Sequence, residues 1–184
     1  GKIELASELL LTLGGSRLPE PADPLTLCSS ALRKNLERKG GTHLAMITGS
    51  RKQPYNASMY FNNKTFRSQT PCPVAEVSPA TASRLGLVAG DSIEIATDNG
   101  TARFLLATAP MRDDLVSVDY GWWHPEWKPG APDFGGIWES NVNCLTSCAR
   151  GEPLIGTWSY NAIDCMVRKV EEPLSWETEL PEKM

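Results

Sequence analysis

The chain has 184 residues, of which 41% are hydrophobic and 22% are charged, and its formal net charge is −4. This length is enough for one sizeable domain, and the negative charge argues against a general nucleic-acid binder, which needs a basic face for phosphates. No apolar run is long enough to span a bilayer. The five cysteines are scattered along the chain, which is unlike a disulfide framework, and the spacing of Cys144 and Cys148 differs from that of a zinc knuckle. We therefore expect no metal site in this chain.

Residues 1–42 are predicted to form an irregular arm that leads into the folded domain. The arm begins with a short strand or helix, which ends at Gly14 and Gly15. The following stretch SRLPEPADPL contains three prolines and cannot be a regular element. At the other end of the chain, the acidic residues 172–184 are predicted to be a surface tail.

Residues 43–171 are predicted to be the folded domain. Ser78 is a natural N-cap and Pro79 suits the first helical position, so a short helix is expected from there to Gly86. The tripeptide Asp98-Asn99-Gly100 is typical of a type I′ turn and predicts a β-hairpin. Short strands with Gly and Pro turns favour a sandwich or a barrel, and a barrel leaves no sheet edge. Six strands are expected, at HLAMIT (43–48), VAEVS (74–78), SIEIAT (92–97), TARFLLATA (101–109), LVSVDYGWW (115–123) and IDCMVRKV (163–170).

Four segments in this order resemble a known family: MITGSRKQPYNAS, PCPVAEVSPATASRLGLVAGDSIEIATDNGTARFLLAT, VSVDYGWWHPE and ESNVNCLT. With their spacing, they resemble the C-terminal domain of the dimethyl sulfoxide reductase family. Its members are molybdenum or tungsten enzymes that carry bis(molybdopterin guanine dinucleotide). The resemblance implies a mainly β fold with short helices, a six-stranded double-psi β-barrel of the aspartate-decarboxylase-like type. It also implies that the domain covers and positions this cofactor in a larger oxidoreductase.

The resemblance has consequences for partners and activity. In family members the metal ligand, any iron–sulfur cluster and much of the substrate funnel lie outside the C-terminal domain. None of these parts is recognisable in this sequence. We therefore expect one domain of a longer prokaryotic protein, inactive on its own, with its compartment, cytoplasm or periplasm, left open. The expected partners are the N-terminal catalytic domains of the same polypeptide and an iron–sulfur electron-transfer subunit. The competing interpretation is a stand-alone double-psi barrel that acts as a protein-interaction module and needs no dinucleotide donors.

The stretch TGSRKQ is the first candidate for contact with the cofactor. Gly49 allows close backbone approach or a positive φ, and successive N–H groups after a strand can hold an anion. Thr48 and Ser50 add hydroxyls, and Arg51 adds a planar donor fork suited to phosphate. The resemblance places the start of the cofactor-contacting loop here and a further polar contact near Ser58. Without it, a turn with solvated charges is the simpler interpretation.

The stretch WESNVNCLT is the second candidate. In an extended segment Asn141 and Asn143 share a face, and an amide offers both a donor and an acceptor, as a pterin edge requires. The pair indicates either a ligand site or a tight polar turn. The resemblance matches Asn143 to a recurrent asparagine of the family. Relatives also carry a polar residue, just before their last strand, that reaches a guanine or a pterin. Tyr160 and Asn161 lie close to that position in this sequence.

The tryptophans of YGWWHPEW form the third candidate. Adjacent strand residues point to opposite sides, so one of Trp122 and Trp123 is expected in the barrel and the other against the cofactor or the catalytic domain. The alternative is that both serve only in packing. His124 has no visible acidic partner and is interpreted as structural or exposed, and no catalytic residue is expected in this chain.

Overall fold

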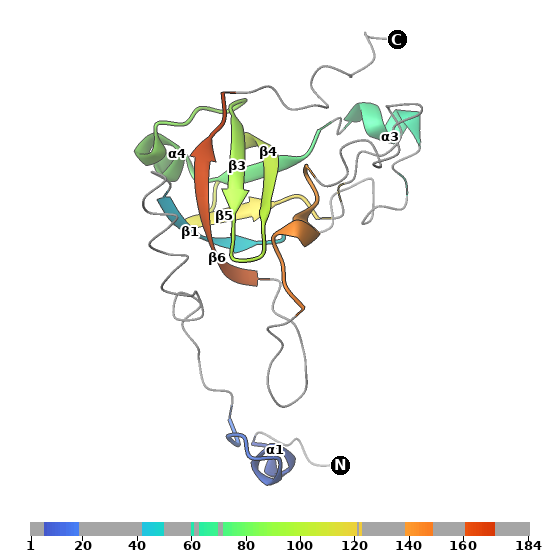
Figure 1. Cartoon of the computed structure of the whole chain (residues 1–184), viewed down its shortest axis with the longest axis vertical. Coiled ribbons are helices and arrows are strands. Elements are labelled where there is room, and N and C mark those ends of the chain that lie inside the picture. Colours follow the sequence, from blue (N-terminus) through green and yellow to red (C-terminus); the bar gives the residue numbers. More distant parts are fainter. Residues whose placement is uncertain are drawn as a thin grey trace.

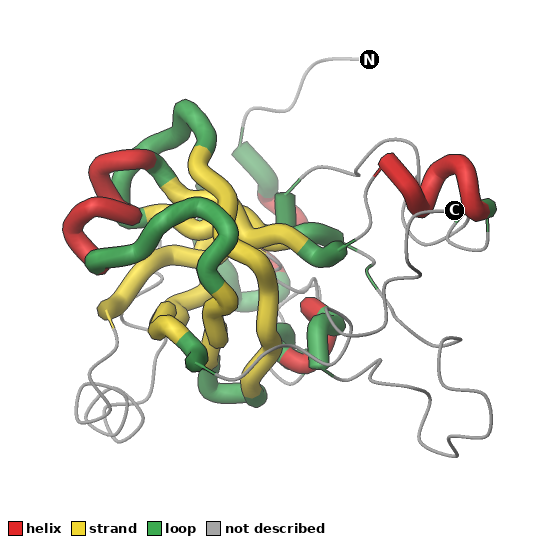
Figure 2. Tube along the Cα trace, turned by 90° about the horizontal axis from the view of Figure 1, so that it is seen from above, coloured by secondary structure: helices red, strands yellow, loops and turns green. Residues whose placement is uncertain are grey.

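Six strands close into a barrel, with the order β1-β5-β2-β4-β3-β6 around its wall (Figures 1 and 2). The computed structural model describes residues 6–18, 42–49, 60, 63–69, 72–120, 122, 139–148 and 161–171. The predicted six-stranded β-barrel is confirmed. The strands are β1 (Thr42–Ile47), β2 (Val74–Val77), β3 (Ser92–Ala96), β4 (Thr101–Thr108), β5 (Leu115–Val118) and β6 (Asn161–Lys169).

The strand directions reveal an internal repeat of connectivity. β1 is parallel to β5 and β2 is parallel to β4, whereas the other neighbouring pairs are antiparallel. Exchanging β1, β2 and β3 for β4, β5 and β6 reproduces every one of these relations. This is the double-psi β-barrel that was predicted. Strands β1, β3 and β5 run toward one end of the barrel, and β2, β4 and β6 run toward the other.

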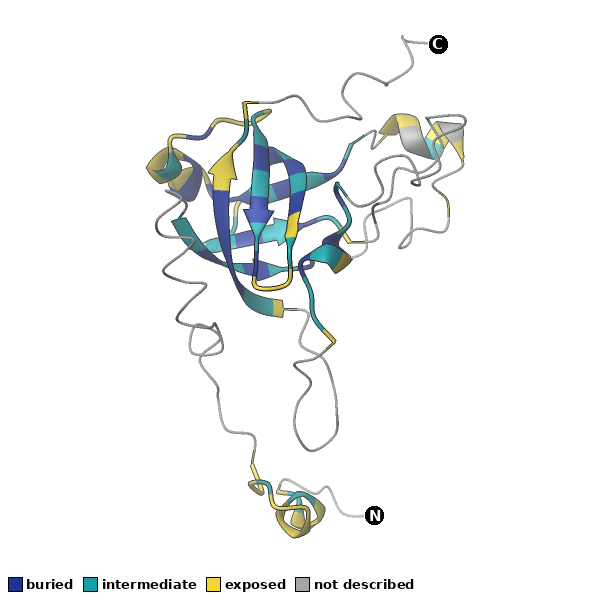
Figure 3. Cartoon of the chain, viewed as in Figure 1, coloured by how far each residue is buried: buried dark blue, intermediate teal, exposed yellow. Residues whose placement is uncertain are grey.

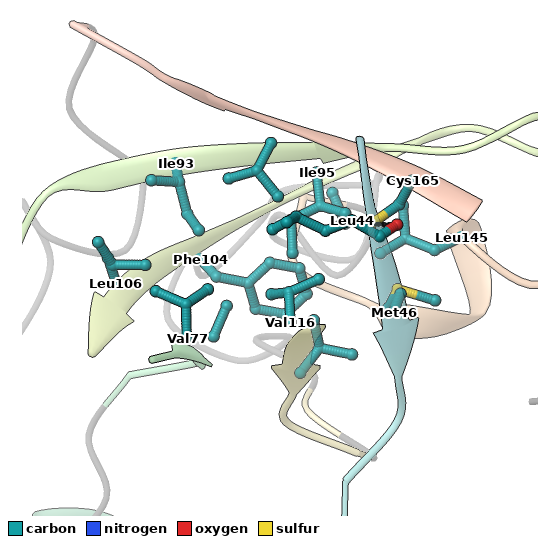
Figure 4. Packing of buried hydrophobic residues seen from close by; sticks show 14 of the residues in the cluster. Leu44, Met46, Val77, Ile93, Ile95, Phe104, Leu106, Val116, Leu145 and Cys165 are labelled. Atoms are coloured by element: carbon teal, nitrogen blue, oxygen red, sulfur yellow. Dashed lines mark hydrogen bonds between the residues drawn. The ribbon is translucent and has the colours of Figure 1, made fainter. Parts of the chain in front are cut away.

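Alternating side chains of the strands fill the barrel, as expected for strands with one buried face. Figure 4 shows the ring of Phe104 in the middle of this core, with Ile93 on one side and Met46, Leu145 and Cys165 on the other. Each large apolar side chain buried in this way contributes about 1.5–3 kcal/mol. Burial raises the pKa of the Cys165 thiol, so this cysteine is a core group and not a reactive one.

Helix α4 (Pro79–Leu85) follows β2 and forms as predicted (Figure 1). The Ser78 side chain accepts a hydrogen bond of 3.0 Å from the backbone N–H of Thr81, which satisfies one of the free donors of the first turn. The helix ends at Gly86, whose φ is +66°. One face of the helix joins the core cluster through Ala82.

The β3–β4 hairpin forms, but its turn is not of type I′. Positive φ is absent at both Asn99 and Gly100, and the backbone N–H of Thr97 donates to the carbonyl of Gly100 across 2.9 Å. A Cβ atom on Gly100 would lie only 2.7 Å from the carbonyl oxygen of Cys144. The glycine therefore serves the close approach of another segment and not a positive φ, which is why the turn rule predicted the wrong geometry.

Three further elements differ from the sequence prediction or refine it. The start of the arm is a helix, α1 (Glu8–Thr12), with no buried residue (Figure 3). The connection between β1 and β2, for which no helix is predicted, contains a helix, α3 (Lys64–Gln69), whose N–H groups at Thr65 and Phe66 are bound by the side chain of Asn63. Strand β5 ends at Val118 and does not include Trp122, which corrects the longer strand predicted there. Within the described ranges, none of the helices has the length and hydrophobicity to cross a membrane.

Candidate functional site

One end of the barrel carries both long connections of the folded domain. Residues 48–73 leave it after β1 and return at β2, and residues 119–160 leave it after β5 and return at β6. The β3–β4 hairpin lies at the same end, together with the short 3-10 helix η3 (Val142–Cys144) (Figure 1). We call this the asparagine end, after Asn99, Asn141, Asn143 and Asn161.

All of the predicted site residues belong to these two connections. Met46 and Leu145, which lie close in sequence to Thr48 and Asn143, occupy the same side of the core (Figure 4). The two connections start from neighbouring parts of the barrel, because the strands that they follow, β1 and β5, are paired. The described predicted residues are Thr48, Gly49, Trp122, Asn141 and Asn143. The others lie outside the described residues: Ser50, Arg51, Ser58, Trp123 and Tyr160.

The two residues that follow β1, Thr48 and Gly49, are held by contacts with β5 and β6. The backbone N–H of Thr48 donates to Oδ1 of Asn161 across 3.3 Å, and the Thr48 side chain is buried. Gly49 has a φ of +60°, and a Cβ atom there would lie 3.0 Å from Oγ of Ser117 and 3.1 Å from the carbonyl oxygen of Val118. The positive φ considered for Gly49 is present, and the close approach that it allows is to Ser117 and Val118 of the same chain. The residues that follow Gly49 thus start from a fixed backbone.

A β-bulge at the start of β6 brings Asn161 to that position. The register between β1 and β6 shifts between Met46 and Ile47, and Ala162 has a φ of +58°. A left-handed conformation costs a residue with a Cβ atom about 1–2 kcal/mol. Such strain persists only where the surrounding structure enforces it, and it is concentrated at functional sites.

The segment around η3 is a tight polar turn and not an extended strand. Oδ1 of Asn141 accepts a hydrogen bond of 2.9 Å from the backbone N–H of Asn143, because an asparagine readily caps the chain two residues ahead. The prediction that the two side chains share one face is therefore wrong. Asn141 is half-buried and its oxygen is used within the turn, whereas the side chain of Asn143 is exposed. Of the alternatives left open by the sequence, the structure shows the polar turn, and a contact between Asn143 and a ligand stays a prediction.

The β3–β4 hairpin holds this turn through residues that the sequence analysis did not assign to the site. Oγ1 of Thr97 donates to the carbonyl of Leu145 across 2.9 Å. Nδ2 of Asn99 donates to the carbonyl of Cys144 across 3.1 Å and also to the carbonyl of Thr146. The only sequence signal was the Asn-Gly pair, which indicated a turn but not its tertiary partner.

Trp122 is covered by protein, with 2% of its surface exposed. This burial favours the packing interpretation for Trp122. Trp123, the other member of the predicted pair, lies outside the described residues, so its contact with a cofactor stays a prediction.

The chemistry of the asparagine end fits a polar, anionic ligand. Its amides are neutral, and several of its carboxylates are already engaged. Asp119 accepts a hydrogen bond of 2.9 Å from the backbone N–H of Val74, and Glu139 lies 3.8 Å from Arg103. Asp98, at the tip of the hairpin, is an exposed carboxylate in the described part of this end. Amide donors and acceptors beside a backbone with a positive φ suit phosphates and heterocycle edges.

Comparisons with known proteins agree with this chemistry. The model of the family described as Molydopterin dinucleotide binding domain matches residues 44–163. Acetylene hydratase of Syntrophotalea acetylenica is 30% identical over 138 residues, which are 73% of this chain and 18% of that protein. Dopamine dehydroxylase of Eggerthella lenta is 30% identical over 128 residues, which are 68% of this chain and 12% of that protein.

A solved structure shares the fold over most of this chain. The structure of acetylene hydratase from Pelobacter acetylenicus superposes with a TM-score of 0.75 and 27% identity, over 92% of this chain and 23% of that one. This chain thus spans less than a quarter of the length of each of these relatives. It is a member of the family of molydopterin dinucleotide binding domains, as its resemblance to the dimethyl sulfoxide reductase family predicted.

Proposed function

We propose that the asparagine end holds one side of bis(molybdopterin guanine dinucleotide) in a larger molybdenum- or tungsten-dependent oxidoreductase. The observation that carries this proposal is the convergence of two long connections at one end of the barrel, where the fold holds the backbone at Gly49 and at Asn143 and leaves the side chain of Asn143 exposed. The family supports a molybdopterin dinucleotide. The guanine form and the choice of metal are part of the proposal.

Each part of the site has a distinct role in this proposal. Gly49 starts a phosphate-binding backbone that continues through Ser50 and Arg51, and the amide of Asn143 hydrogen-bonds the edge of a pterin or guanine. Ser58, Trp123 and Tyr160 complete the contact, and the support for these three is their position in the two long connections. When bound, the cofactor supplies the metal-centred chemistry, and the residues of this chain bind it and keep it oriented.

The partners follow from the size of the relatives. The domain is part of a bigger polypeptide in those proteins, so the other face of the cofactor belongs to catalytic domains outside this chain. We also propose an iron–sulfur subunit as the electron partner. The competing function, a stand-alone interaction module, has no support among the curated relatives described above, which are several times longer than this chain.

Cofactor retention tests the proposal directly. The variants Asn143→Ala and Arg51→Ala are made in the full-length protein, and pterin fluorescence after oxidation and metal content are measured per mole of purified protein. We expect both variants to lose cofactor several-fold, because each removes a donor aimed at an anionic or heterocyclic group. The melting temperature of Asn143→Ala should be unchanged, since its side chain forms no hydrogen bond within the described part of the chain.

The matched control is Ser83→Ala, an exposed position on α4 at the opposite end of the barrel. It should retain cofactor like the unmodified protein. Full cofactor content in both Asn143→Ala and Arg51→Ala would contradict the proposed site.

A further inference from the structure

Three successive carbonyl groups, from the last residue of η3 onward, are bound by one hairpin tip. The carbonyl of Leu145 accepts from Oγ1 of Thr97, and the carbonyls of Cys144 and Thr146 both accept from Nδ2 of Asn99. The last carbonyls of a helix have no partner within the helix. Here the hairpin supplies those partners, and one amide group spans two of the three carbonyls.

A hydrogen bond within the tip and the absence of a Cβ atom at Gly100 support this contact. The backbone N–H of Asn99 donates to Oγ1 of Thr97 across 3.1 Å, so the Thr97 hydroxyl accepts from the tip and donates to the turn. Thr97 is 6% exposed, which keeps water from competing for these bonds. Gly100 has no Cβ atom, and one would lie 2.7 Å from the carbonyl oxygen of Cys144.

These contacts fix the backbone on both sides of Asn143. On one side, the Asn141 side chain binds the N–H of Asn143 across 2.9 Å. On the other side, Asn99 binds the carbonyl of Cys144, and the side chain of Leu145 is buried in the core. The Asn143 side chain therefore leaves the turn in a direction set by the hairpin.

We infer that the hairpin tip Thr97–Gly100 is a positioning element for the cofactor-binding turn, with Asn99 as its positioning residue. The inference rests on the proposed function, because it assigns Asn143 to the cofactor. Asn99 acts through the backbone and is not itself assigned a contact with the ligand. A ligand that binds several groups at once gains affinity when each group is held in place before binding.

The variant Asn99→Asp tests the inference, because aspartate has the same shape but cannot donate to the two carbonyls. In the full-length protein we expect cofactor to dissociate about tenfold faster, the factor expected when hydrogen bonds to the backbone are lost. Amide hydrogen exchange in residues 139–148 should rise in the same variant. Asn99→Ala, which removes the donor without adding a charge, should show the same two changes and serves if Asn99→Asp fails to fold.

A double variant separates positioning from a general loss of stability. If Asn99 acts by placing Asn143, the effect of Asn99→Ala on cofactor release should largely disappear when Asn143 is already alanine, because coupled residues are not additive. Thr101→Ala, a change at the exposed first residue of β4, directly after the tip, is the matched control and should leave both exchange and release unchanged.

The outcomes distinguish this inference from the proposed function. The positioning role would be overturned if the fold-increase in release rate of the double variant equalled the product of the two single fold-increases. It would also be overturned if amide exchange and cofactor release stayed normal in Asn99→Ala. In that case a cofactor loss in Asn143→Ala alone would still support the proposed site. Normal retention in Asn143→Ala would instead reject the site, and the inference with it.

Discussion

The two ends of the barrel are related by the internal repeat of strand order, but they differ in their connections and in their chemistry. The other end, which we call the α4 end, has α4 and the connection 109–114, and it is closed by charged and hydroxyl groups. There Oγ of Ser78 donates to Asp113, Arg84 pairs with Asp114, and Lys169 pairs with Asp91 across 2.7 Å. The asparagine end has the long connections and neutral amides. Because strand order is equivalent at both ends, the fold alone does not decide where a ligand binds, and loop length and side-chain chemistry do.

Backbone strain also differs between the two ends of the barrel. At the α4 end, positive φ falls on Gly86, Gly90 and Asp114, and the last is held by Arg84 and by Oγ1 of Thr81. Aspartate tolerates the left-handed region better than most residues. At the asparagine end an alanine, Ala162, has a φ of +58°. This strain is consistent with a site whose geometry matters more than local stability.

The largest effect is expected at Gly49. Gly49→Ala should lower the free energy of unfolding by about 2–3 kcal/mol, because it combines left-handed strain with overpacking against Ser117 and the backbone of Val118. Gly90→Ala at the α4 end is the matched control, since its φ is +94° but no atom lies within 4 Å of the added Cβ. It should cost only the strain, about 1–2 kcal/mol. Urea unfolding of both variants measures the difference, and equal losses would show that close approach at Gly49 is not required.

A smaller effect is expected from Ser78→Ala at the α4 end. The variant removes the N-cap of α4 and the hydrogen bond to Asp113, and an N-cap contributes about 0.5–2 kcal/mol. Thermal unfolding should show this loss, whereas cofactor content of the full-length protein should be normal. A fall in cofactor content as large as that of Asn143→Ala would break the division of roles between the two ends.

Most strands of the barrel could be predicted from the sequence, because they depend on residues that are neighbours in the chain. This holds for the alternation of apolar and polar residues in β1 and β3. It also holds for α4, whose start and end are indicated by Ser78, Pro79 and Gly86. The site depends on distant partners. Asn99 binds Cys144 across 45 positions of sequence and Thr48 binds Asn161 across 113, and no local pattern encodes such pairs. For the same reason Gly100 was assigned to turn geometry, when its neighbour in space is the turn after Asn141.

The smallest expected effect concerns pH at the α4 end. A hydrogen bond from Lys169, and then one from the backbone N–H of Val88, hold the pKa of Asp91 below its ordinary value of 3.8. The same pairing raises the pKa of Lys169 above 10.5. The stabilisation by the Asp91 charge is thus present above pH 3.8 and is lost as pH falls through the lowered pKa; that of Lys169 is present below pH 10.5 and is lost as pH rises through the raised pKa.

Asp91→Asn keeps an acceptor for Val88 but replaces the oxygen that faces Lys169 with an amide donor, so it removes the ion pair and its hydrogen bond together. The variant should be slightly less stable than the unmodified chain at neutral pH, by less than Ser78→Ala, because an ion pair whose lysine is 45% exposed is screened by solvent and contributes little. The difference should vanish once the pH falls below the lowered pKa of Asp91, and it should shrink in concentrated salt. A difference in stability between the variant and the unmodified chain that stays constant from neutral to acidic pH would show that the pair acts through packing and not charge. At the asparagine end the amides do not titrate, so the effect of Asn143→Ala on cofactor release should remain constant over the same pH range wherever the protein stays folded.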